Sequence, residues 1–147
     1  MLEFKNKLPF VEDVSLYDIM KVCQTPFYIY SQKMITQKVK YLKKNLSKNI
    51  FFSVKSNSNQ AVLKLIHSLD IGADVVSIGE LKRSLSAGFP ANKIIFEGVG
   101  KSKEDLIYAI QNNIRLVNTE SIDEIKLIQT LALEKNKIVD IGVRLNP

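Results

Sequence analysis

Short apolar runs alternate with amphipathic stretches along most of the chain. The runs span residues 50–54, 73–76, 94–96, 115–117 and 138–143, and they recur at a period of roughly 22 residues. Between them, apolar residues such as Leu63, Ile66 and Leu69 follow helical spacing. No hairpin signal joins consecutive runs. The pattern therefore predicts five parallel strands, each followed by a helix and joined to the next by a right-handed crossover.

A separate lead-in precedes this alternation. After an irregular start, Thr25-Pro26 opens an aromatic and β-branched run, residues 27–30, which predicts a strand. A helix is expected over about residues 32–46, with Val39 and Leu42 on its apolar face. We therefore divide the chain into a lead-in segment and strand, residues 1–31, and a strand-helix domain, residues 32–147.

Three of the predicted helices share a start signal. The pairs Ser77 and Glu80, Ser102 and Asp105, and Ser121 and Glu124 each form S-x-x-[DE] before an amphipathic stretch. At this spacing two side chains can satisfy free amides at a helix N-terminus reciprocally. In a parallel barrel these turns lie at the C-terminal ends of the strands, where active sites are built.

Two other architectures fit the period less well. A leucine-rich repeat needs a ladder of leucines with an asparagine at a fixed place, and these units share no such frame. A doubly wound sheet would favour a G-x-G-x-x-G turn after the first strand, which is missing here. The short, even period favours an α/β fold of the (β/α)8 TIM barrel type.

Composition and charge exclude several classes of function. Hydrophobic residues make up 46% and charged residues 24% of the 147 residues, as in ordinary globular proteins. The net charge is +6, but basic residues are interleaved with acidic ones, so we expect no nucleic-acid partner. One cysteine, Cys23, and one histidine, His67, cannot build a disulfide or a zinc site within the chain. With no signal peptide and no membrane span in the sequence, a cytoplasmic protein is expected.

Lys55 is the first candidate for chemistry. It closes the apolar run at residues 50–54, and parallel strands are usually covered on both faces. An amine held among apolar groups has a lowered pKa and can form a Schiff base with an aldehyde. A lysine that marks the strand end and reaches water fits the spacing equally well. The residues alone leave both interpretations open.

The segment Gly100-Lys101-Ser102 could be mistaken for a phosphate-binding loop. A P-loop would need glycine at position 95, where this chain has Ile95. We therefore interpret the segment as a turn between strand and helix that packs Gly98 and Gly100 closely and caps the next helix.

Five segments, in order, resemble motifs of one enzyme family. Residues 52–57 (FSVKSN) resemble Y-A-x-K-A-N, residues 72–81 resemble G-x-D-V-V-S-x-G-E-L, and residues 96–102 resemble F-x-G-x-G-K-S. Residues 119–124 and 144–147 resemble D-S-x-x-E-L and R-V-N-P. These are motifs of the alanine-racemase-like, or fold type III, pyridoxal-phosphate (PLP) enzymes, and the likeness is greatest to the diaminopimelate decarboxylases. Departures are mild: Phe52 replaces tyrosine, Ser53 and Ser56 replace alanine, and Ile78 stands where glycine is usual.

The resemblance implies a cofactor and site residues. Lys55 would be the catalytic lysine that binds PLP, and Asp74, Glu80 and Arg144 would border the cofactor. Each of the last two has a plainer alternative: Glu80 as part of a helix cap, Arg144 as a surface arginine. His67 and Cys23 are read as structural.

The resemblance also implies an activity, decarboxylation of meso-diaminopimelate to L-lysine. Only five of eight barrel strands are expected here, and the strand at residues 27–30 would belong to a C-terminal β-domain. The chain would thus be a truncated or split enzyme completed by a C-terminal half, or a noncatalytic remnant. Arginine, ornithine or carboxynorspermidine decarboxylase and alanine racemase remain alternatives. A homodimer is expected for a complete enzyme.

Overall fold

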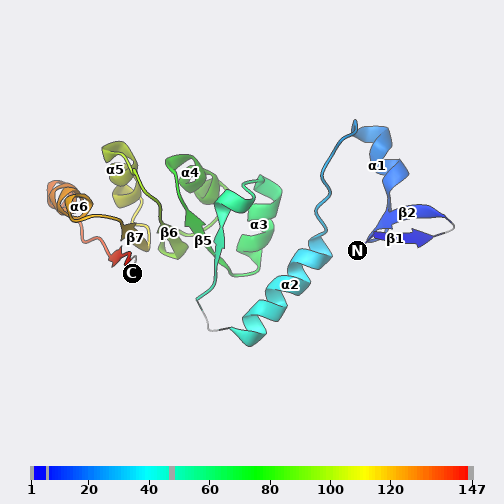
Figure 1. The fold of residues 1–147 in the computed structure, drawn as a ribbon, viewed down its shortest axis with the longest axis horizontal. Coiled ribbons are helices and arrows are strands. Elements are labelled where there is room, and N and C mark those ends of the chain that lie inside the picture. The colour runs from blue at the N-terminus through cyan, green and yellow to red at the C-terminus, as the bar shows by residue number, and fades with distance from the viewer. Residues whose placement is uncertain (1, 6, 47–48, 146–147) are drawn as a thin grey trace. The chain divides into compact units, whose positions relative to one another are not determined.

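The structure is a computed structural model that describes residues 2–5, 7–46 and 49–145 (Figure 1). The chain divides into two compact units, residues 1–46 and residues 47–147, which are described separately. The helix over residues 32–45 groups with the first unit. The boundary between residues 31 and 32 stays a prediction about the complete fold. In the described part of the chain, none of the helices has the length and apolarity that crossing a bilayer requires.

The first unit begins with regular structure where an irregular start was expected. Strands β1 (Leu2–Lys5), β2 (Leu8–Val11) and β3 (Val14–Ser15) form an antiparallel sheet in chain order, followed by helix α1 (Leu16–Val22). That expectation was wrong because the turns carry no glycine. Lys7 and Glu12 adopt the left-handed backbone conformation instead, with φ of 66° and 57°, and such residues give little turn signal in a sequence.

The strand predicted at residues 27–30 is not present. The backbone there is unpaired, and Tyr28 is 90% exposed. A strand requires a neighbour that pairs with its N–H and C=O groups, and no described strand is hydrogen-bonded to this run in a sheet. The apolar and β-branched residues of this run favour an extended backbone, but without a hydrogen-bonded neighbour the run does not form a strand.

Helix α2 (Gln32–Asn45) confirms the helix expected at 32–46 and is tied to the first sheet by Glu12. The Glu12 carboxylate accepts hydrogen bonds from the Ser31 hydroxyl and from the Lys33 amide, the latter at 2.8 Å. The Ser31 hydroxyl accepts in turn from the Met34 amide at 3.0 Å. These bonds favour the ionised carboxylate, so they lower the pKa of Glu12, with the Ser31 hydroxyl as the largest cause.

The second unit is built on a five-stranded parallel sheet in chain order. Its strands are β4 (Phe51–Ser53), β5 (Gly72–Val75), β6 (Ile94–Phe96), β7 (Leu116–Thr119) and β8 (Ile141–Val143). Each strand pairs with the next one along the chain. The predicted strands, their parallel direction and their order are confirmed.

Four helices connect these strands: α3 (Gln60–Ser68), α4 (Ile78–Ser86), α5 (Lys103–Gln111) and α6 (Ile122–Glu134). Short 3₁₀ turns η1 (Val54–Ser56) and η2 (Ala91–Lys93) follow β4 and precede β6. Ser77, Ser102 and Ser121 cap α4, α5 and α6 as predicted. The full reciprocal box forms only at Ser102 and Asp105.

The helices lie along one face of this sheet (Figure 1). On that face the strands place fully buried apolar residues, among them Val75, Ile94, Phe96 and Val117. Successive strand residues point to opposite faces, and the residues between these, such as Asp74 and Asn118, are only partly buried. The sheet therefore has one apolar face packed on helices and one face that carries polar side chains.

The link between Glu12 and α2 gives a pH prediction. Because the folded-state pKa of Glu12 lies below the ordinary value of 4.5, ionised Glu12 stabilises the first unit above that value. The stabilisation is lost as pH falls through the folded-state pKa. An NMR titration of the Lys33 amide should have its midpoint below 4.5, and Ser31→Ala should move the midpoint upward. An unchanged midpoint in Ser31→Ala would contradict this cause.

Candidate functional site

Polar side chains gather where the parallel strands end. Ser53 ends β4 and pairs in register with Asp74 of β5. Glu97 follows β6 directly, and Asn118 of β7 pairs with Gly142 of β8. Because parallel strands end at one edge of a sheet and paired residues share a face, these groups line one edge of the polar face. This is the edge at which parallel barrels place their active sites.

Lys55 lies one residue beyond Val54, in the turn η1 that follows β4. Of the two interpretations that the sequence left open, the structure has the lysine that ends the strand and reaches water, because Lys55 is exposed while Val54 is fully buried. The chain leaves the strand before Lys55, and in the described residues the polar face beside it has no covering layer of strands. The ammonium group is still near enough to Asp74 to lower the pKa of that carboxyl.

Asp74 lies close to three charged side chains, those of Glu97, Lys55 and Glu80, which all act on its carboxyl group. Burial raises the pKa of its carboxyl, and the negative charge of Glu97 adds to this effect, whereas Ser53 and Lys55 act in the opposite direction. The Oδ1 atom of Asp74 and the Oγ atom of Ser53 are buried, and neither has a hydrogen-bond partner of acceptable geometry among the described residues.

Two buried oxygens without partners beside a lysine suit a polar aldehyde. Buried polar atoms in native structures normally have a partner, and PLP carries polar substituents around its ring. Lys55 supplies the amine that such an aldehyde needs. The residues present therefore fit the cofactor that the sequence motifs imply.

Glu97 and Asn118 form a second polar pair on the same face. The Asn118 side-chain amide donates to Glu97 Oε1 at 2.6 Å. The side chain of Asn118 extends over Gly142, where an added Cβ atom would lie 2.0 Å from its Oδ1. Glycine at position 142 thus makes room for this pair.

Glu80 contacts the backbone rather than the open face. Its carboxylate accepts a hydrogen bond from the Val76 amide at 2.9 Å, and its own amide donates to Ser77 Oγ at 3.2 Å. Glu124 repeats the arrangement with the Glu120 amide and Ser121. In the predicted box each carboxylate would bind the amide of the capping serine. Both bind the amide of the residue before that serine instead, and so hold the strand-to-helix turn. A role for Glu80 at the cofactor stays a prediction.

Arg144 directly follows β8 and points to Glu120. Its guanidinium lies 3.4 Å from Glu120 Oε1, with side chains 54% and 19% exposed respectively. Its backbone amide donates to the Thr119 carbonyl at 3.0 Å. The last two residues of the R-L-N-P segment, 146 and 147, lie outside the described residues. The structure therefore brings Lys55, Asp74 and Glu97 together and places Arg144 with Glu120.

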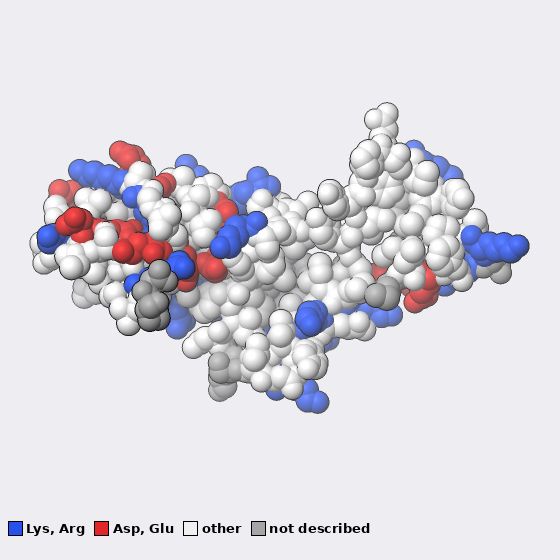
Figure 2. Space-filling view, in the orientation of Figure 1, with Lys and Arg blue, Asp and Glu red and all other residues white. Residues whose placement is uncertain are grey.

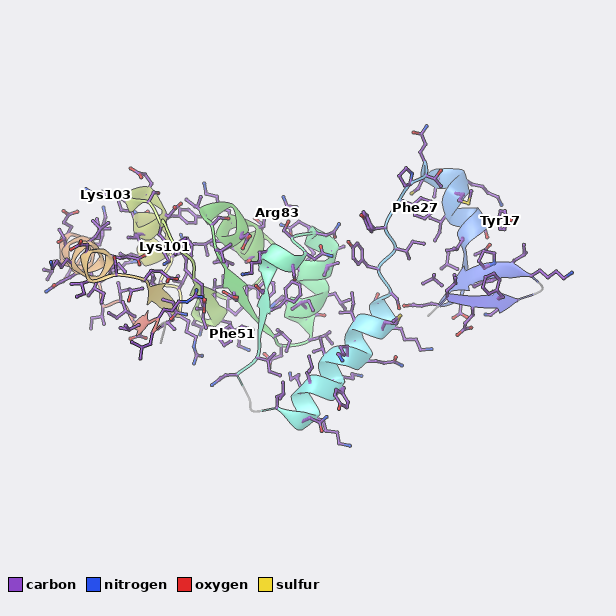
Figure 3. All side chains as sticks on the ribbon, viewed as in Figure 1. Tyr17, Phe27, Phe51, Arg83, Lys101 and Lys103 are labelled. Carbon is purple, nitrogen blue, oxygen red and sulfur yellow. The ribbon has the colours of Figure 1, made fainter. Side chains whose placement is uncertain are left out.

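Lys101 is buried, although sequence reasoning assigned it no role. Its side chain is 1% exposed, and its ammonium group donates to Gly98 O and Asn118 O at 2.7 Å and to Glu124 Oε1 at 2.9 Å (Figure 3). All three of its N–H donors thus have protein acceptors, unlike the lysine of a phosphate-binding loop. The segment is a turn between strand and helix, as predicted, and Ser102 caps the next helix. Gly98 packs against Val76, where an added Cβ atom would lie 3.4 Å from the Val76 Cβ, but the close packing expected of Gly100 was wrong, because nothing lies within 4 Å of an added Cβ atom there.

The sequence alone gave little indication of these partners. Glu97 occupies a variable position of F-x-G-x-G-K-S, and Asn118 lies inside a strand without a motif of its own. The His67 ring packs against the Phe89 ring, with 5.4 Å between the two ring centroids, and Cys23 is exposed. In residues 2–5, 7–46 and 49–145, no three His, Cys, Asp or Glu side chains are grouped so that they could hold a metal ion.

Charge is mixed over this unit. Figure 2 shows acidic and basic side chains interleaved around the C-terminal strands and helices, without one continuous basic surface. Phosphate-backbone binding relies on such a basic surface.

The buried Lys101 gives a stability prediction. Lys101→Met would leave the Glu124 carboxylate, whose side chain is 13% exposed, without its partner. Removing one member of a buried ion pair costs about 3–5 kcal/mol. Lys103→Met, on the exposed first turn of α5, is the matched control and should have an effect within about 0.5 kcal/mol. Urea unfolding of both variants tests this, and equal stability of the two would contradict it.

A second prediction concerns the room for Asn118. Gly142→Ala should displace the Asn118 side chain, break its bond to Glu97 and cost about 1–3 kcal/mol, as overpacking does. Gly79→Ala is the control, because its nearest neighbour would be Ser77 Oγ at 3.7 Å. Urea midpoints and the NMR signals of the Asn118 side-chain amide report the difference. A Gly142→Ala variant as stable as Gly79→Ala would show that the clearance is not needed.

Comparisons with known proteins agree with this arrangement. The family described as pyridoxal-dependent decarboxylase, pyridoxal binding domain, matches residues 32–147. The chain is 46% identical over 126 residues to the diaminopimelate decarboxylase of Campylobacter jejuni, covering 84% of this chain and 31% of that protein. It is 38% identical over 134 residues to that of Bacteroides thetaiotaomicron, covering 88% and 35%. The chain thus spans about a third of the length of these relatives.

Solved structures give the same result for the fold. The diaminopimelate decarboxylase of Helicobacter pylori, complexed with L-lysine, has a TM-score of 0.83 and 35% identity, over 90% of this chain and 34% of that chain. The enzyme of M. jannaschii has a TM-score of 0.87 and 31% identity, over 99% and 36%. The five-stranded sheet and its helices are therefore the N-terminal part of a PLP-binding (β/α)8 barrel. This chain belongs to the pyridoxal-binding domain family of the pyridoxal-dependent decarboxylases, whose cofactor is pyridoxal phosphate.

Proposed function

We propose that this chain is the N-terminal part of a decarboxylase that converts meso-diaminopimelate to L-lysine, with Lys55 as the residue that binds PLP. The observation that carries the proposal is the position of Lys55 at the end of β4, beside Asp74 and two buried oxygens without partners. The 46% identity to a diaminopimelate decarboxylase supports the choice of substrate.

The proposed roles follow from the contacts of each residue. When bound, PLP supplies an electron sink for the charge left after carbon dioxide departs. Lys55 provides the amine that holds the aldehyde. Asp74, whose pKa is raised by burial, is suited to hold a proton close to that amine.

Glu80, in the helix after β5, and Arg144, directly after β8, complete the proposed cofactor-binding set. Glu80 keeps the turn after Asp74 in place through the Val76 amide, so its contribution is one of positioning. Arg144 lies beside Glu120, and its side chain is 54% exposed, which leaves it able to meet an anionic group of cofactor or substrate.

The other candidate substrates have weaker support. The arginine decarboxylase of Paramecium bursaria Chlorella virus has a TM-score of 0.77 but 22% identity, which establishes a shared fold alone. Arginine, ornithine and carboxynorspermidine decarboxylase and alanine racemase thus remain alternatives. A noncatalytic remnant is the other reading, because the chain spans about a third of its relatives.

Activity is proposed to require further strands. Strand β8 is one of the two edge strands of the sheet, and its Ile141 and Val143 are 38% and 62% exposed. Beside it α6 carries an apolar groove of about 340 Å³ lined in part by Ile128, Ala132 and Leu133. Such surfaces favour a covering partner. We propose a complementing C-terminal half, a homodimer as the complete form, and a cytoplasmic location.

Cofactor binding tests the role of Lys55. The purified chain with added PLP should develop the absorbance of a protein-bound cofactor, and borohydride reduction followed by peptide mapping should place the label on Lys55. Lys55→Ala should lose this signal. Lys64→Ala, an exposed lysine on α3, should keep it. Equal labelling of the two variants would refute the assignment.

Carbon dioxide release tests the activity. The chain mixed with a polypeptide that supplies the remaining strands and the C-terminal β-domain should release carbon dioxide from meso-diaminopimelate and yield L-lysine. Arginine and ornithine serve as alternative substrates in the same assay. If carbon dioxide is released from none of diaminopimelate, arginine and ornithine, the noncatalytic remnant is favoured.

A further inference from the structure

We infer that Glu97 is a positioning residue, held by Asn118 on the same face of the sheet as Asp74, so that a second carboxylate lies near Asp74 on the side of the sheet that Lys55 adjoins. The inference rests on the proposed function only where it invokes Lys55 as the cofactor-binding amine. Its structural part concerns Glu97, Asn118 and Asp74 and can be tested without any cofactor.

The sheet register places the two carboxylates on one face. Asp74 pairs with Ile95 of β6, and Glu97 is two residues further along the same strand direction. Residues two apart in a strand point to the same face. The Glu97 amide donates to the Val75 carbonyl at 2.8 Å, so the backbone is still held in the ladder at this point. Glu97 therefore faces the same side as Asp74, from the neighbouring strand.

A chain of contacts keeps Glu97 in this position. Asn118 donates to its Oε1 atom at 2.6 Å. Lys101 fixes the Asn118 carbonyl at 2.7 Å, and Gly142 leaves the space that the Asn118 side chain occupies. Removing a hydrogen bond from such a network frees a long carboxylate to turn toward water, where its charge would be screened.

Three charged groups act on Asp74. Lys55 from η1 favours its ionised form, while Glu97 after β6 and Glu80 of α4 disfavour it, Glu97 more strongly. Glu80 is engaged by the Val76 amide, and Ser53 is the neutral neighbour from β4. Of the two negative charges near Asp74, Glu97 thus has the larger effect, and Asn118 holds it in place.

This balance matters to Lys55 because only a neutral amine can bind an aldehyde. Two ionised carboxylates in close proximity repel, so Glu97 disfavours ionisation of Asp74 and weakens the negative charge that faces the Lys55 ammonium group.

Carboxyl NMR of the full chain is the direct test. The Asp74 carbon signal is assigned with Asp74→Asn and titrated in wild type, Glu97→Gln and Glu104→Gln. Glutamine keeps the acceptor for Asn118 and removes the charge, so the Asp74 midpoint should fall in Glu97→Gln. Glu104 is exposed on α5 and makes an equal change in net charge. An Asp74 midpoint that moves equally in both variants would overturn the inference.

Two further variants separate position from charge. Asn118→Ala leaves the Glu97 carboxylate charged but removes its hydrogen bond, so the titration midpoint of Asp74 should fall by less than it does in Glu97→Gln. In Glu97→Asp the negative charge remains, so the Asp74 midpoint should lie between those of the wild type and Glu97→Gln. A merely structural Glu97 would leave the midpoint unchanged in every variant that stays folded.

The pH profile of PLP binding links the inference to Lys55. The acid limb of cofactor absorbance should move in Glu97→Gln and not in Glu104→Gln. If no variant binds PLP while the NMR shift is observed, the proposed function fails and the carboxylate pair stands. If PLP binds identically in all variants and the NMR midpoint does not move, the pair fails and the proposed function stands.

Discussion

The site of the second unit depends on one geometric constraint: parallel strands joined by helices all end at the same edge of the sheet. Residues distant in sequence, Ser53, Asp74, Glu97 and Asn118, meet there because each follows or ends a strand. Apolar residues at alternate positions pack against the helices and hold the strands in register. A one-residue slip would send the polar groups into the helix-covered core, so the same alternation that stabilises the sheet also fixes the site.

Buried charge is tolerated near this edge because it is fully hydrogen-bonded. Lys101 loses nearly all its water, yet each of its three donors has an acceptor, one of them the ionised Glu124. Asp74 is the opposite case, since a buried oxygen lacks a partner and a like charge lies nearby. In the first arrangement, loss of either partner would leave a buried charge unpaired and so destabilise the fold. The second leaves a carboxyl group whose proton affinity depends on its neighbours, which is the property that acid-base chemistry requires.

Periodicity predicted the five strands, their order and the three serine caps, because each rests on local pattern and short-range contacts. It failed for residues 2–15, where turns form without glycine, and for residues 27–30, where the strand signal has no partner. The motifs led to Lys55 and Asp74. They did not lead to Glu97, and they included Lys101 and Glu124 without indicating that the two side chains pair, because contacts between residues about 20 positions apart leave no local pattern.

The exposure of Lys55 changes how its reactivity is to be explained. Burial among apolar groups would have favoured the neutral amine by desolvation, but Lys55 is exposed, so that cause is weak in this structure. What remains is the nearby carboxyl group. Burial of Asp74 and the negative charge of Glu97 both raise the pKa of the Asp74 carboxyl, so the charge that Lys55 faces depends on the surroundings of its neighbour.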